Sequence, residues 1–188
     1  MAETDRSEPE WIGEVLDFWF KDLSRADWYR KSKGLDETVR ARFQGLHDRI
    51  ARCHPDPADA PARTLLAAVI VLDQFPRNMF RDTARAFAAD PLALALAKAA
   101  VSRGVDWGLS FDQRHCLYLP FQHSEDLADQ ARACDLYEAL GDTEGLDFAR
   151  RHKVVIERFG RFPHRNAALG RASTPEETVF LKQPGSAF

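Results

Sequence analysis

The chain has 188 residues, of which 45% are hydrophobic and 29% are charged, and these proportions are typical of a globular domain rather than a disordered chain. Its 26 basic and 29 acidic residues give a net charge of −3, which excludes a globally basic nucleic-acid-binding protein. The longest apolar run, Leu65 to Leu72, is far shorter than the roughly 20 residues that a membrane-spanning helix needs. We therefore expect one soluble domain over residues 1–188, without a membrane partner.

The N-terminal residues and the cysteines indicate the cellular compartment in which the protein is found. The stretch from Met1 to Pro9 is polar and acidic, unlike a signal peptide. Cys53, Cys116 and Cys134 are odd in number and lack CxxC spacing, which is typical of reduced thiols. These features predict a cytoplasmic protein.

Apolar residues recur at helical spacing in the first half of the chain. The capping box Ser7–Glu10 predicts the start of a first helix that reaches Trp19. A second helix is expected from about Asp36 to Cys53, and prolines separate it from a third, Ala62 to about Asp73. The run Leu65–Leu72 in this third helix is apolar on all sides. A strand is the alternative for it, but its alanines and flanking residues favour a helix.

N-cap residues, prolines and glycines divide the second half of the chain. They predict helices from Asp90 to Gly104, from Ser110 to before Pro120, from Ser124 to Gly141, from Thr143 to about Gly160, and a short last helix opened by the capping box Thr174–Glu177. No alternating strand pattern is present. The fold expected is all-α, with seven or eight helices.

Two near copies of one string follow aliphatic helix ends: Asp73–Asn78 (DQFPRN) and Arg161–Asn166 (RFPHRN). Because proline disfavours a helix at the preceding residue, Phe75 and Phe162 are expected to leave their helices and pack inward. Asn78 and Asn166 are then candidates for left-handed turns.

The arginines in these strings have two interpretations. Arg77 and Arg165 would lie near helix C-termini, where they could merely satisfy the last carbonyl groups. Alternatively, both guanidinium groups bind one anion in a shared pocket, since arginine suits bidentate recognition of carboxylate or phosphate. The duplication of so specific a string favours the second interpretation.

The histidines also leave alternatives open. The string His123–Asp126 has a purely structural explanation, in which Ser124 is an N-cap and Glu125 and Asp126 lie in the first turn of the helix. Alternatively, His123 lies beside these carboxylates to transfer protons or to bind a metal. His152 shares an apolar helix face and is more often a hydrogen-bonded core residue than a ligand. His123, His152 and His164 have no local metal-site spacing, so a metal site could arise only through the fold, and we name no metal ligand from the sequence.

Basic residues concentrate near the C-terminus. Between Arg150 and Arg171 there are seven of them, against Glu157 alone. A solvated face is one explanation and a nucleic-acid patch is another. Few aromatic residues are interleaved with the basic ones, so we do not expect nucleic-acid binding.

Several of these strings together resemble the bacterial domain of unknown function 924 family. They are Leu72–Asn78, Tyr118–Phe121 with His123–Asp126, Phe159–Asn166 with Leu169–Arg171, and Phe18–Phe20. The resemblance extends from about Trp11 to Leu181 and implies a tetratricopeptide-repeat-like stack of antiparallel helix pairs. It implies no particular activity or cofactor. Gln122 departs from the acidic residue expected before the histidine.

Two functions of different classes follow. The first is a ligand-binding or enzymatic domain for a small anion, which Arg77 and Arg165 would bind as a clamp. The candidate acid–base groups are His123, His164 and Glu125. Asp73 and Glu125 would orient these bases or balance the charge. The pocket of this domain is expected to gather Asp73, Arg77, Asn78, His123, Glu125, His152, Arg161, His164, Arg165 and Asn166. The second is a helical-repeat scaffold that binds a protein or peptide partner in a groove. Convergence of the polar residues in one closed cavity, with perturbed histidines, would favour the first function. Their spread over an exposed concave face would favour the second.

Overall fold

The aliphatic run Leu65–Leu72 forms the centre of the molecule. In the computed structural model, which describes residues 8–186, all eight of these residues are fully buried. Most of the run lies in helix α4 (Ala62–Val69), and α1 (Glu10–Asp17), α6 (Asp90–Ser102) and α7 (Phe111–His123) pack against α4. A helix surrounded in this way must be apolar on every face, as the sequence predicted.

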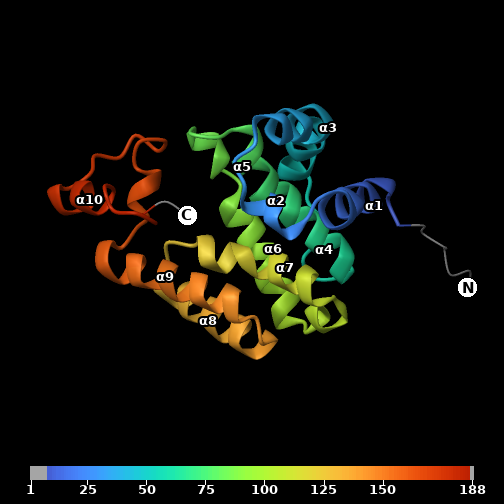
Figure 1. Cartoon of the computed structure of the whole chain (residues 1–188). Helices are drawn as coiled ribbons and strands as arrows, with labels where there is room; N and C mark the ends of the chain where they lie inside the picture. Colours follow the sequence, from blue (N-terminus) through green and yellow to red (C-terminus); the bar gives the residue numbers. More distant parts are fainter. Residues whose placement is uncertain (1–7, 187–188) are drawn as a thin grey trace, which may run out of the picture.

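The remaining α-helices are α2 (Arg25–Tyr29), α3 (Lys33–Arg52), α5 (Phe75–Met79), α8 (Leu127–Leu140), α9 (Thr143–Phe159) and α10 (Pro175–Phe180). Figure 1 shows α3 and α5 above α4, α8 and α9 at the lower left, and α10 set apart at the left edge. Helix α8 packs against both α7 and α9, and α3 packs against α5. The described residues contain no strand, so the all-α prediction is confirmed, although short helices such as α2 and α5 raise the number above seven or eight. No helix in residues 8–186 has the length and apolarity needed to cross a bilayer.

The exit from α4 differs from the prediction. Phe75 does not leave the helix: a π-helical turn, Ile70–Gln74, follows α4 and leads directly into α5, with Pro76 in its first turn. The N–H of Phe75 bonds to the carbonyl of Ile70, five residues back. This wider turn accommodates the proline, whose ring would clash with the carbonyl four residues back in a regular α-helix. Phe75 is nevertheless fully buried, as expected.

The second Phe-Pro string follows the prediction more closely. Helix α9 ends at Phe159, Gly160 takes a positive φ of 68°, and Phe162 is extended and fully buried. The asparagine prediction is wrong at both copies, because Asn78 lies within α5 and Asn166 has α-helical backbone angles. The left-handed positions nearby are Asp82 and Gly170.

Three helix boundaries are corrected. Helix α7 continues through Pro120 to His123, and the burial of its last turns offsets the hydrogen bond that the proline lacks. Asp126 rather than Ser124 caps α8, by accepting hydrogen bonds from the N–H groups of Ala128 and Asp129. Helix α6 begins at Asp90 itself. Ser7 lies outside the described residues, and α1 begins after Pro9.

Candidate functional site

The π-helical turn after α4 brings a buried carboxylate to the end of α7. Asp73 has no exposed surface, and its two oxygens lie 2.8 and 3.0 Å from Nδ1 of His123, the last residue of α7. Gln74 donates a further hydrogen bond to Asp73 over 2.5 Å. Because a carboxylate can only accept, Nδ1 of His123 carries the proton and Nε2 is left as the acceptor of the neutral ring.

The charges around this pair fix its protonation. Burial alone would raise the pKa of Asp73, but Arg77 and His123 outweigh it and hold that pKa well below its usual value. Burial and the nearby Arg77 lower the pKa of His123. At neutral pH the pair is therefore a carboxylate beside a neutral imidazole, which is the arrangement of a base and the group that orients it.

Asp90, the first residue of α6, joins the two Phe-Pro strings. Arg77 forms a bidentate pair with it, with nitrogen–oxygen distances of 3.0 and 2.9 Å. Arg165 Nη1 lies 3.4 Å from Asp90 Oδ2. Both guanidinium groups therefore converge as the sequence suggested, but on a carboxylate of the protein itself. The sequence indicated Asp90 as a helix cap and missed this role.

Arg165 makes fewer hydrogen bonds than Arg77. Its guanidinium lies over the rings of Phe87 and Phe162, 4.8 and 4.6 Å from their centroids, and the residue is only 6% exposed. Its Nε has no hydrogen-bond acceptor among the described residues. Burial, together with repulsion from Arg77, lowers the pKa of Arg165 to about 10, so the group remains a cation at neutral pH.

Two further histidines lie beside these groups. The ring of His152 is 6.3 Å from that of His123 and 5.5 Å from that of Phe162, and its Nδ1 donates to the carbonyl of Phe148 over 2.7 Å. The ring of His164 is 5.6 Å from that of Phe162. Burial, followed by repulsion from neighbouring groups, lowers the pKa of both His152 and His164 to about 3. Both imidazoles are uncharged at neutral pH.

We call these groups the arginine–histidine cluster. It combines two guanidinium groups and two carboxylates with three neutral imidazoles, and its members are Asp73, Arg77, Asp90, His123, His152, His164 and Arg165. Six of the seven were predicted site residues. The described residues contain no group of three or more potential metal ligands in binding geometry.

The four other predicted site residues have structural contacts instead. Asn78 points to α3 and donates to Asp36 over 2.8 Å. Asn166 donates to Ser173 and accepts from Arg171. Arg161 and Glu125 complete this group. Each binds a partner in residues 162–186, which we call the C-terminal segment.

These two contacts fix the C-terminal segment in place. Arg161 forms a bidentate pair with Glu177, at 2.7 and 2.9 Å. Glu125 accepts from the N–H of Phe162 over 2.8 Å and pairs with both terminal nitrogens of Arg171. Burial would raise the pKa of Glu125, but these hydrogen bonds lower it overall, so this carboxylate is already committed to Phe162 and Arg171.

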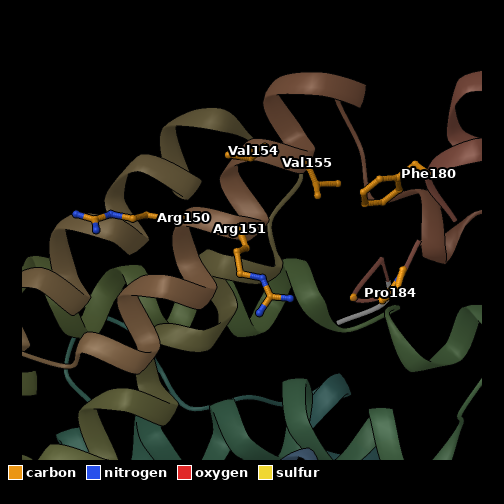
Figure 2. A pocket seen from close by; sticks show the side chains of 7 residues that line it. Arg150, Arg151, Val154, Val155, Phe180 and Pro184 are labelled. Atoms are coloured by element: carbon orange, nitrogen blue, oxygen red, sulfur yellow. The ribbon is translucent and has the colours of Figure 1, made fainter. Parts of the chain in front are cut away.

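A hollow of about 340 Å³ lies elsewhere, between α9 and the C-terminal segment (Figure 2). Figure 2 shows Val155 on α9 directed toward Phe180, with Pro184 below Phe180 and the side chain of Arg150 pointing away from both. The lining also includes Arg151, Val154 and Gly185, and no member of the arginine–histidine cluster takes part.

The comparisons with known proteins agree with the resemblance noted in the sequence. One solved structure, described as a protein of unknown function, ATU0120 from Agrobacterium tumefaciens, is similar to this chain with a TM-score of 0.85 and 44% identity. The match covers 91% of this chain and 96% of that one. No curated protein matches significantly. A family model matches residues 15–185, and the chain therefore belongs to the DUF924 family of bacterial proteins of unknown function.

Proposed function

We propose that this protein binds a small anionic ligand at the arginine–histidine cluster, in the cytoplasm. Arg165 carries the proposal: it is a buried cation whose contact with Asp90 is 3.4 Å long and whose Nε has no acceptor among the described residues. A buried cation without a full set of acceptors costs free energy. A ligand that supplies acceptors to Arg165 would recover part of this cost.

The chemistry of the cluster favours a compact anion such as phosphate, sulfate or a small carboxylate. Such a group matches the planar fork of arginine. Asp90 already occupies Arg77 in bidentate fashion and acts as an internal competitor. We infer that the ligand binds by displacing Asp90 from Arg165 or by sharing Arg165 with it.

Proton transfer to or from the bound ligand is the enzymatic form of this proposal. His123 is the strongest candidate base, because Asp73 orients it through Nδ1 and leaves Nε2 as the acceptor. His164 is neutral for the reason given above and is a second candidate. Glu125 contributes by holding Phe162 in place rather than by moving protons.

Thermal unfolding in the presence of phosphate, sulfate and small carboxylates tests the proposal. Wild-type protein should be stabilised by about 2.7 kcal/mol at an anion concentration 100 times the dissociation constant. Arg165→Ala and Arg165→Lys should both abolish this gain, since lysine keeps the charge but loses the fork. Arg158→Ala is the matched control from the same basic stretch, because Arg158 pairs with Glu176 on the surface.

Asp90→Asn sharpens the test. This change removes the internal competitor, so the anion-dependent stabilisation should increase rather than fall. Arg165→Ala also removes the contacts of the guanidinium with Phe87 and Phe162, so each variant is compared with itself in the presence and absence of anion. The proposal would be overturned if no anion changed the melting temperature of the wild-type protein, or if an anion still raised that of Arg165→Ala.

A helical-repeat scaffold is the second candidate. Its support is that α6, α7, α8 and α9 pack against one another in chain order, as in a tetratricopeptide-repeat-like stack, and that Trp107 beside them is 69% exposed. A protein or peptide partner would then bury Trp107. Titration with such a partner should change the fluorescence of wild-type protein and leave that of Trp107→Phe unchanged.

A further inference from the structure

A second buried histidine lies eight residues before His123 on α7, about 12 Å away along the helix axis. His115 is 3% exposed, and its Nδ1 is 2.6 Å from a carboxylate oxygen of Asp142, the N-cap of α9. On its other side, Nε2 is hydrogen-bonded to the hydroxyl of Tyr29 on α2. Three elements thus place a hydroxyl, an imidazole and a carboxylate in line.

The contacts determine the tautomer of His115. Two groups approach Nδ1: a carboxylate oxygen of Asp142 at 2.6 Å and Nη2 of Arg25 at 3.2 Å. The shorter contact is with the carboxylate, which can only accept, so the proton of the neutral imidazole is on Nδ1. Burial lowers the pKa of His115, which keeps the ring neutral at pH 7. Nε2 is therefore an acceptor, and Tyr29 must donate its hydroxyl proton to it. A hydroxyl, a base and a group that orients the base are the parts of an activated nucleophile.

The side chain of Tyr29 is partly exposed to solvent, unlike those of the other tyrosines. It is 53% exposed, whereas Tyr118 and Tyr137 are fully buried. Its ring stacks on the exposed ring of Phe148, with centroids 6.3 Å apart. Burial of its hydroxyl raises the pKa of Tyr29, so attack at neutral pH requires a base such as His115.

The surrounding charges select the kind of electrophile. Asp112, Asp142 and Glu144 all lie within 3.7 Å of Arg25, so three carboxylates share one guanidinium. Arg151 lies over the ring of Phe148 and adds a second cation. This acidic setting disfavours a phosphoryl donor and favours a neutral acyl donor, whose apolar part the exposed ring of Phe148 can contact.

We propose that Tyr29 is an acyl-acceptor site for neutral activated acyl compounds, with His115 as its general base and Asp142 as the positioning residue. The phenolic oxygen attacks the acyl carbon while its proton passes to Nε2 of His115. The bond between the acyl carbon and the leaving group then breaks, and the leaving group takes that proton. The products are an O-acyl tyrosine and the protonated leaving group, with no change in oxidation state.

Acetylation by N-acetylimidazole at pH 7, followed by peptide mass spectrometry, tests this site. Tyr29 should be acetylated at least about tenfold faster than free N-acetyltyrosinamide, because general-base assistance contributes roughly 10²- to 10⁴-fold. Tyr29→Phe keeps the ring that stacks on Phe148 and should abolish O-acetylation of the native protein, in which the other tyrosines are buried.

Asp142→Asn distinguishes the role of Asp142 in orienting His115 from its role as the N-cap of α9. An asparagine can still accept from the N–H of Gly145, as Asp142 does over 2.9 Å, but it no longer stabilises an imidazolium. The rate at Tyr29 should fall at least about tenfold in this variant. Asp126→Asn, the same change at the N-cap of α8, should leave the rate unchanged. A wild-type rate no greater than that of the free amide, or equal rates in Asp142→Asn and wild type, would show that the three groups only hold α2 in place.

Discussion

Burial determines the charge state of His152. The residue is 5% exposed, and loss of hydration lowers its pKa to about 3, as it does for His164. An unfolded chain holds both histidines near their ordinary pKa of about 6.5. The native protein therefore binds fewer protons than the unfolded chain at every pH between about 6.5 and 3.

This difference predicts a loss of stability in mild acid. Stability is fully present above pH 6.5 and falls as the pH decreases, by about 1.4 kcal/mol per pH unit for each histidine concerned. Urea unfolding between pH 5 and 7.5 measures the slope, in a range above the ordinary pKa values of carboxyl groups. His152→Gln should reduce the slope by about one proton, because glutamine can donate to Phe148 without titrating.

His54 is the matched control for this prediction, since it is exposed. His54→Gln should keep the wild-type slope. If His152→Gln and wild type lose stability equally as the pH falls, the burial argument for the uncharged cluster fails.

At the scale of elements, two helical glycines occupy opposite environments. A Cβ on Gly145, in the first turn of α9, would lie 2.5 Å from the ring of Tyr137 on α8. Tyr137 cannot withdraw easily, because it is fully buried and its hydroxyl donates to the carbonyl of His115. A Cβ on Gly45, within α3, would meet no atom within 4 Å.

The same substitution should therefore have opposite effects at these two sites. Gly45→Ala should stabilise the protein by about 0.5–1 kcal/mol, because alanine is the better helix former. Gly145→Ala should destabilise it by about 1–3 kcal/mol, because overpacking outweighs helix propensity. Chemical denaturation of both variants checks the signs, and stabilisation by Gly145→Ala would mean that α8 and α9 pack more loosely than described.

At the scale of the whole molecule, ion pairs offset the charge of several residues in the basic stretch of the sequence, Arg150 to Arg171. Acidic residues from other parts of the chain pair with it: Asp90 with Arg165, Glu125 with Arg171, Glu176 with Arg158 and Glu177 with Arg161. Ion pairs therefore make many of the contacts of the C-terminal segment. They are supplemented by a small apolar cluster of Val155, Ile156 and Phe162. Most of the core belongs to a separate cluster around α4.

This division predicts independent local opening of the C-terminal segment. Glu125→Gln weakens the bidentate pair with Arg171, so amide hydrogen exchange in residues 162–174 should accelerate about tenfold while exchange in α4 stays unchanged. Glu176→Gln, at an exposed pair, is the matched control and should have little effect. Equal acceleration across the whole chain would indicate one cooperative unit instead.

The sequence alone indicated most of the longer helices and several residues of the candidate site. Hydrophobic periodicity and capping residues are local signals, so they predicted the buried run Leu65–Leu72 and the caps at Ser110, Gly141 and Thr174. The repeated Phe-Pro string indicated that Arg77 and Arg165 belong together, and the structure brings both to Asp90.

Only the tertiary structure decided how the helices continue and which charges meet. Pro120 lies within α7 and Pro76 within α5 because burial and a π-helical turn outweigh a local preference that the sequence expresses clearly. The partners of Arg165 and His115 lie 75 and 27 residues away in the chain, and no spacing rule connects positions so distant. Pairing between charges depends on distance in space, and packing of α6, α7 and α9 brings these groups together.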